Sequence, residues 1–105
     1  MNERIVCAAI WYCVPAKYSH QPVNIESGFV ISGMRHHNCF TTVAIIKHYF
    51  NGILGDIVEK KVQGFITTKH RFVDRVEGFK IAKEANQLIG RDAEIENWLD
   101  SSDLY

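Results

Sequence analysis

The spacing of apolar and polar positions divides the first third of the chain into two strands and a loop. Residues 4–14, RIVCAAIWYCV, are apolar at both alternating positions and rich in Ile, Val, Trp and Tyr. Such a pattern is typical of a central strand that is covered on both faces. Pro15 ends this segment and begins a polar loop that contains both prolines of the chain, Pro15 and Pro22. Residues 28–34, GFVISGM, then predict a second short strand that pairs with the first.

The period changes to that of a helix at His37 or Asn38. Asn38 is a good N-cap residue, and Asn51-Gly52 supplies a stop signal, so we predict a helix of about three turns between them. Its apolar positions lie about one turn apart at Phe40, Val43, Ala44, Ile46 and Phe50.

A hairpin and a second helix are predicted in the second half. Residues 51–64 look like a connection with little pattern, and Gly64 opens a hairpin formed by GFITT, a turn at Lys69-His70, and RFV. Asp74 followed by Glu77 has the spacing of a capping box. The helix that follows, which we expect to end at Gly90, has one apolar stripe: Val76, Phe79, Ala82, Ala85, Leu88 and Ile89.

The last segment, residues 92–105, contains five acidic residues and no Lys or Arg. We expect a short helix around Trp98 and Leu99 and an acidic tail. The order of elements predicts an α+β fold in which a small antiparallel sheet packs against two main helices plus a short C-terminal helix. At 105 residues the chain is expected to form a single domain, residues 1–105.

Composition restricts the possible partners. Twelve Lys and Arg balance twelve Asp and Glu, so the uniformly basic surface needed for non-specific nucleic-acid binding is not expected. No apolar run approaches the roughly 20 residues of a membrane span, and no cleavable leader is recognisable. The three cysteines have no CxxC spacing, and we interpret them as reduced core thiols of a cytoplasmic protein.

Candidate chemistry gathers before the two predicted helices. A helix start offers unpaired N–H groups and about half a positive charge, and an adjacent arginine completes a site for phosphate or carboxylate. Two such sites suit a ligand with two phosphates, and nearby aromatic rings could stack on a base. The first start carries Arg35, His36, His37 and Asn38; the second carries Arg71, Asp74 and Arg75, after Lys69 and His70; the aromatic residues are Phe40, Tyr49, Phe65 and Phe72.

Structural roles for the same residues remain open. One of the histidines could be satisfied by a backbone carbonyl, and Arg75 could pair with Glu77 or with the acidic tail. Large aromatic residues at strand and helix spacing usually lie in a core, which is the alternative for Phe65, Phe72 and Phe79.

Metal binding and catalysis are two further hypotheses for the segment around His36, His37 and Cys39. His36, His37 and Cys39 could begin a zinc site, but the sequence offers no second closely spaced Cys or His pair, and no metal or cofactor is predicted. Cys39 could also be a nucleophile whose pKa is lowered by the helix start. No Asp or Asn is recognisably placed to orient a base, so no catalytic residue is predicted.

Several motifs in this order resemble a known family. GMRHHN after an N-terminal strand, then QGFITTKHRFVDR, IAKEANQ and a final SSDLY, are similar to the motifs of the phage anti-Thoeris sponge proteins, which bind and hold the cyclic ADP-ribose signal of a bacterial defence system. The resemblance extends over nearly the whole chain. The chain departs from the family in three places. The region between the Arg-His-His segment and GFITT is short. The terminal motif is DSSDLY where the family has Ser-Glu-Asp-Leu-Tyr, and VEGFKIAKEANQ replaces the more usual Ala-Ala before Ile-Ala.

The resemblance implies a sequestering protein rather than an enzyme, which acts in the cytoplasm of the infected bacterial host. It also implies a homo-oligomer with ligand pockets between protomers. The balanced charge and the absence of a long apolar run give the expectation of no nucleic-acid or membrane partner. The family's two ligand-binding arginines correspond to Arg35 and Arg75 in this chain. His36, His37, Asn38, Thr67 and Phe72 are further candidates for the pocket wall, whereas Asp74 is better explained as an N-cap.

Two other functions remain as alternatives. The first is a nucleotide-processing enzyme, such as a hydrolase, that uses His36 or His37 as a general base. The second is a phage protein that binds a host protein through its acidic tail.

Overall fold

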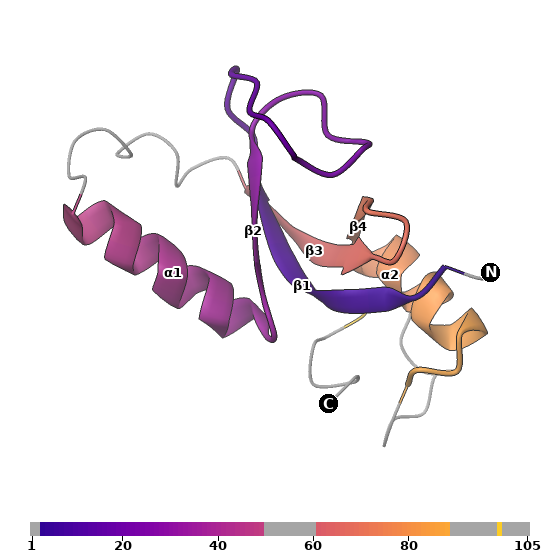
Figure 1. The fold of residues 1–105 in the computed structure, drawn as a ribbon. Coiled ribbons are helices and arrows are strands. Elements are labelled where there is room, and N and C mark those ends of the chain that lie inside the picture. The colour runs from indigo at the N-terminus through magenta and orange to yellow at the C-terminus, as the bar shows by residue number, and fades with distance from the viewer. Residues whose placement is uncertain (1–2, 50–60, 89–98, 100–105) are drawn as a thin grey trace.

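The computed structural model describes residues 3–49, 61–88 and 99, and in these ranges the fold is α+β, as the pattern predicts. In chain order the elements are β1 (Ile5–Tyr12), β2 (Phe29–Gly33), α1 (His36–Tyr49), β3 (Lys61–Thr67), β4 (Phe72–Asp74) and α2 (Arg75–Glu84). The four strands form one antiparallel sheet in the order β2-β1-β3-β4. Helix α1 packs against β2 and β1, and α2 packs against β3 and β4 (Figure 1).

Strand β1 is an inner strand of the sheet, which explains why it is apolar at both alternating positions. Residues that lie opposite each other in antiparallel strands share a face of the sheet. Ala8, Ile10 and Tyr12 therefore lie on one face, which we call the helix face because both helices pack there. Cys7, Ala9 and Trp11 lie on the other, which we call the loop face because the segment between β1 and β2 contributes to its surface.

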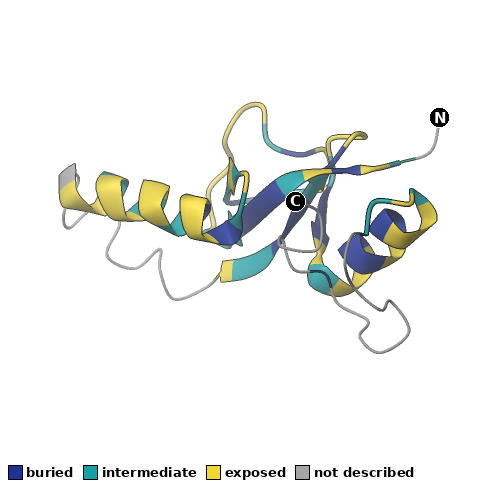
Figure 2. Ribbon diagram, turned by 90° about the horizontal axis from the view of Figure 1, so that it is seen from below, coloured by how far each residue is buried: buried dark blue, intermediate teal, exposed yellow. Residues whose placement is uncertain are grey.

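The helix face holds two apolar clusters, one under each helix. The cluster under α2 is buried more completely: Ile5, Ala8, Phe65, Val73, Phe79, Ile81, Ala82 and Leu99. The cluster under α1 contains three buried residues, Ile10, Tyr12 and Cys39, and partly buried neighbours such as Phe40 and Val43. Figure 2 shows the consequence, because most of α1 is coloured as exposed whereas α2 is buried on the side toward the sheet.

Helix α1 begins at His36, so the prediction of Asn38 as its N-cap is wrong. Asn38 lies in the first turn, where its Oδ1 accepts a hydrogen bond of 2.9 Å from the N–H of Arg35. This contact satisfies the N–H of the residue that precedes the helix, as the third helical residue does in a capping box. The predicted end of the helix at Asn51-Gly52 lies outside the described residues.

Two other predicted boundaries are corrected. Strand β3 begins at Lys61 rather than Gly64, because Lys61, Val62 and Gln63 continue the pairing with β1. Helix α2 begins after the predicted N-cap Asp74, whose side chain accepts from the N–H of Glu77, but it ends at Glu84 rather than near Gly90.

The early end of α2 has a local cause. Asn86 adopts a left-handed conformation with φ of 60°. The N–H groups of Asn86 and Gln87 then return to the carbonyls of Lys83 and Ala82, which is the hydrogen-bond pattern of a Schellman motif. Of the predicted apolar stripe, Phe79 and Ala82 are buried, whereas Val76 is 46% exposed.

Leu99 is the described part of the C-terminal segment. Its side chain is fully buried in the cluster under α2, and its N–H donates to the carbonyl of Arg75. The short helix predicted around Trp98 otherwise lies outside the described residues.

Candidate functional site

The starts of both helices meet at two adjacent residues of β3. Nε2 of His36, in the first turn of α1, lies 2.8 Å from the carbonyl oxygen of Gly64. Nη2 of Arg75, the first residue of α2, donates to Oε1 of Gln63 at 2.7 Å. Gly64 is also the register partner of Asp74, the N-cap of α2. Two segments that are far apart in sequence therefore bring two positive helix ends toward the middle of one strand.

His36 is held in the sheet rather than presented to solvent. It is 7% exposed, and its ring meets the ring of Phe65 edge to face at 5.0 Å. Because a carbonyl can only accept, Nε2 carries the proton and donates it to Gly64. The alternative in which one histidine is satisfied by a backbone carbonyl is thus correct for His36.

Arg75 joins β3 to the C-terminal segment. Besides its bond to Gln63, its Nη1 donates to the carbonyl of Leu99 at 2.9 Å. Glu77, one of its predicted partners, pairs with Arg71, and the acidic residues of the tail lie outside the described residues. The guanidinium is half-buried, and it places a permanent positive charge beside the first turn of α2.

The remaining residues of the Arg-His-His segment lie at the surface of the same helix start. Arg35 is half-buried and immediately precedes α1, and His37 and Asn38 are exposed in its first turn. Arg35, His36, His37 and Asn38 lie together because they are consecutive in sequence. Of these four, His36 reaches Gly64 of β3, the register partner of the α2 N-cap Asp74.

Thr67 and Phe72 lie away from the meeting point of the two helix starts. Thr67 is buried at the end of β3, and its hydroxyl donates to the carboxylate of Glu3. Phe72 lies on the loop face, where its ring contacts that of Trp11. Within one chain, the structure thus does not bring Phe72 together with His36 and Arg75.

The sequence pattern did not indicate Gln63, although it forms part of the site. It sits in a stretch that looked like an unpatterned connection, and its role follows from the pairing of β3 with β1. The available signal was weak: Lys61, Val62 and Gln63 alternate polar and apolar for only three residues.

Thiol and metal chemistry receive no support at this site. Burial raises the pKa of Cys39 to about 11, so the predicted lowering by the helix start is wrong. Burial likewise raises the pKa of Cys7, and the three cysteines form no disulfide. Among the residues that the structure describes, no group of three His, Cys, Asp or Glu side chains could hold a metal ion.

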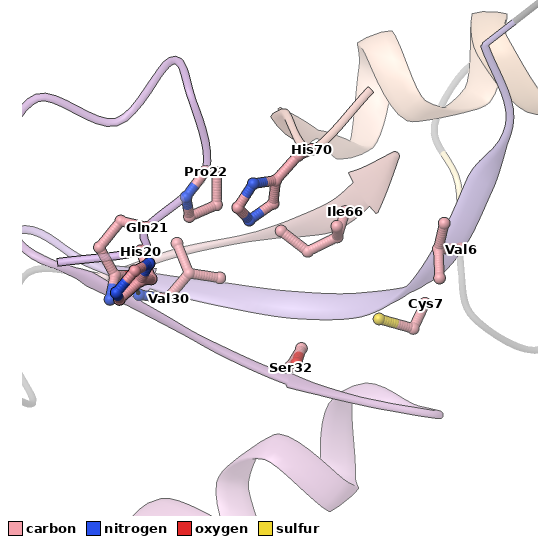
Figure 3. Close-up of a pocket in the computed structure, with 9 residues that line it drawn as sticks. All are labelled: Val6, Cys7, His20, Gln21, Pro22, Val30, Ser32, Ile66 and His70. Carbon is pink, nitrogen blue, oxygen red and sulfur yellow. Dashed lines mark hydrogen bonds between the residues drawn. The ribbon is translucent and has the colours of Figure 1, made fainter. Parts of the chain in front are cut away.

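Among the described residues, the loop face has surface hollows, two of which are similar in size. One of about 350 Å³ lies above β1, β2 and β3, between His20 and His70 (Figure 3). The figure shows the ring of His70 between Pro22 and Ile66, and the thiol of Cys7 on the floor. The other, of about 370 Å³, is bounded by Trp11, Phe72 and the start of α2. Both are separated from His36 by the sheet.

Comparison with known proteins gives a family but no relative of established function. No curated protein matches the chain, and no solved structure does. None of the described helices is long and apolar enough to cross a membrane. One family model, that of the phage T4 y16D protein, matches residues 4–105. Since this match spans every element described above, the chain belongs to the phage T4 y16D protein family.

Proposed function

We propose that this phage protein binds a cyclic ADP-ribose-type or other cyclic nucleotide immune signal and holds it without degrading it. In this proposal it acts as a homo-oligomer in the cytoplasm of the infected bacterium and keeps the signal from the defence effector. The observation that carries the proposal is that the side chains of His36 and Arg75, from the two helix starts, reach the adjacent residues Gly64 and Gln63 of β3.

Electrostatics favours a ligand with phosphate groups at this place. Each helix start contributes unpaired N–H groups and about half a positive charge. Arg35 and Arg75 add two guanidinium groups, whose planar forks match phosphate oxygens. Asp74 offsets part of this charge, but it uses its carboxylate to cap α2. A compact ligand with two phosphates could therefore contact both helix starts.

The state of the ionisable groups supports binding rather than turnover. Nε2 of His36 is engaged with Gly64, so it is poorly placed to act as a general base. Cys39 is protonated at neutral pH because burial raises its pKa, and a thiol is a weak nucleophile. His37 is exposed in the first turn of α1 and is the remaining candidate base of the hydrolase alternative.

The affinity that a sponge needs favours a pocket shared between copies. Nanomolar binding corresponds to about 12 kcal/mol, and each charge-assisted hydrogen bond contributes roughly 1.5 to 3 kcal/mol. Two arginines contribute less than this binding free energy, so the remainder must come from enclosure of the ligand. A second copy of the chain would provide this enclosure at an exposed helix start.

Calorimetric titration with cyclic ADP-ribose isomers and with cyclic di- and trinucleotides tests the proposal. We expect tight binding of one member, and at least a hundredfold weaker binding by Arg35→Gln. Lys17→Gln removes one positive charge from an exposed position in the loop and is the matched control, with unchanged affinity expected. If no member of the panel binds, or if Arg35→Gln binds as the parent does, the proposed site is wrong.

Recovery of the ligand separates the sponge from the hydrolase. After the complex is heated, chromatography should return the ligand unchanged and in equal amount. Release of a cleaved product by the parent, and intact ligand from His37→Gln, would instead establish catalysis by His37.

A further inference from the structure

We propose that the hollow between Trp11 and the start of α2 is a second binding site, which takes an organic cation with an alkylated ammonium group. It lies on the loop face, across the sheet from the strand contact of His36, so it goes beyond the function proposed above. The hollow has a volume of about 370 Å³, which is within the usual range for small-molecule sites.

Two aromatic rings form adjoining walls of this hollow. The ring centroids of Trp11 and Phe72 are 6.2 Å apart, and the ring planes are inclined by 59°. Both rings line the hollow, together with the aliphatic side chains of Ile25 and Val62. Phe72 is 6% exposed, so Trp11 supplies most of the accessible aromatic surface. A cation over the face of this indole would be attracted by the ring, as quaternary ammonium groups are in aromatic cages.

The aromatic walls are fixed by hydrogen bonds. Nε1 of Trp11 donates to the carbonyl of Ser27 at 3.0 Å, which holds the indole in one orientation. The amide of Asn24 holds the backbone of Phe72 from one side, since it accepts from the N–H at 2.8 Å and donates to the carbonyl at 2.6 Å. Because these walls are ordered before any ligand arrives, binding costs little side-chain entropy.

The charge of the lining selects for a cation. Asp74 and Glu77 both line the hollow, and none of the lining residues is Lys, Arg or His. Glu77 is paired with Arg71 at 3.0 Å, which balances its charge. Asp74 accepts from the N–H of Glu77 at 2.8 Å, and its carboxylate lies at the wall of the hollow. The positive end of α2 borders the same hollow, and the two acidic side chains offset it, so that the lining favours a cation over an anion on this side of the helix start.

Alkylation of the ammonium group matches the apolar part of the lining. A primary ammonium is strongly hydrated and loses that hydration against Ile25, Val62 and the two rings. A trimethylammonium group is weakly hydrated and presents methyl groups to the same surfaces. Its charge is still attracted by the rings and by Asp74.

Tryptophan fluorescence provides a direct test, because Trp11 and Trp98 are the two tryptophans of the chain. In a Trp98→Phe background the signal comes from Trp11 alone. We expect choline to change this signal saturably, whereas its neutral isostere 3,3-dimethylbutan-1-ol should bind at least tenfold more weakly. Equal responses to both would overturn the proposal, since the site would then recognise shape without charge.

Asp74→Asn is the sharpest variant because Asn also caps helices well, so the change removes the charge but keeps the cap. It should weaken choline binding at least fivefold while the melting temperature stays within a few degrees. Glu84→Gln, an exposed acid at the end of α2, is the matched control and should leave binding unchanged. Unchanged affinity in Asp74→Asn, or an equal loss in both variants, would contradict the assignment.

A second pair of probes distinguishes the sources of such a cation. Nα-acetyl-trimethyllysine amide reports on a modified protein side chain, and choline reports on a free metabolite or headgroup. Binding of either probe supports the site, and their relative affinity indicates the source. If unmodified Nα-acetyl-lysine amide binds more tightly than both, selectivity for alkylated ammonium is wrong.

Discussion

At the scale of single residues, two side-chain amides act as strand partners, one on the edge strand β4 and one where β1 extends past β2. Asn24 exchanges two hydrogen bonds with the backbone of Phe72, at 2.6 and 2.8 Å. Gln87 exchanges two with the backbone of Ile5, both at 2.8 Å. Each amide satisfies one backbone donor and one acceptor that would otherwise need water or another strand. These contacts fasten the loop after β1 and the segment after α2 to the sheet.

The ion pair between Glu3 and Arg71 gives the protein a pH-dependent contribution to stability. Both carboxylate oxygens of Glu3 accept from Arg71, at 2.8 and 2.9 Å. The hydrogen bond from Arg71 is the main reason that the pKa of Glu3 falls from 4.5 to about 2. The contribution is therefore present above pH 4.5 and is lost as the pH falls toward 2.

We expect Glu3→Gln to lower the free energy of unfolding at pH 7 by about 1 kcal/mol, since the pair is partly exposed. Urea denaturation of both proteins across the acid range measures this value. The difference between parent and variant should shrink steadily below pH 4.5. A difference that is constant with pH would show that the variant acts through packing and not through the charge.

The candidate site was only partly predictable at this scale. The sequence placed Arg35, His36 and Arg75 at helix starts, because capping patterns and apolar periods are local. It could not indicate that His36 contacts Gly64, which is 28 positions away in the sequence, because this contact in space depends on how the strands pair. Burial of the His36 ring against Phe65 follows from the same packing.

At the scale of elements, the two helices differ in what stabilises them. Helix α2 is fixed at its start by Asp74 and at its end by the left-handed Asn86, and its apolar side is buried. Helix α1 has fewer buried positions, and Ile45 is 55% exposed. Its middle contains the β-branched residues of TTVAII, which have lower helix propensity than Ala or Leu.

The left-handed position at the end of α2 predicts a contrast between two substitutions. Asn86→Ala should destabilise the fold by about 1 kcal/mol, because a Cβ without a polar group disfavours positive φ. Asn86→Gly should be neutral or slightly stabilising at the same place. Thermal melts of the two variants measure the contrast, and equal losses would mean that the Asn86 side chain matters more than its backbone conformation.

The weak anchoring of α1 predicts uneven hydrogen exchange. Backbone amides of β1, which is paired on both sides, should exchange slowest, and those in the second half of α1 should exchange fastest among the helical amides. Exchange followed by mass spectrometry at low protein concentration measures both. Protection of α1 that rises with concentration would show that a second copy covers it, whereas uniform protection at all concentrations would contradict the prediction.

At the scale of the whole molecule, the described residues span about 43 by 24 by 18 Å, and the more buried core lies at the α2 end. Leu99 completes that core from the C-terminal segment, between the side chains of α2 and the sheet. Its two backbone hydrogen bonds to Arg75 connect the same segment to the start of α2. Leu99 therefore packs in the hydrophobic core and also holds Arg75 of the candidate site.

Leu99→Ala should therefore cost roughly 2 to 5 kcal/mol of unfolding free energy, as expected for a buried leucine. Val76→Ala shortens a residue on α2 that is 46% exposed, and it is the control, with a change near zero. Urea denaturation gives both values. A small effect of Leu99→Ala would mean that this side chain contributes little to the core.

The sequence by itself determined the α+β class, the central position of β1, the hairpin turn and the N-cap of α2, because these depend on local periods and on capping and turn residues. It also marked both helix starts as polar. Tertiary structure alone decided where β3 begins, which face of the sheet each aromatic ring takes, and that both helix starts meet at Gln63 and Gly64. These features follow from strand register and long-range packing, which local sequence preferences do not encode.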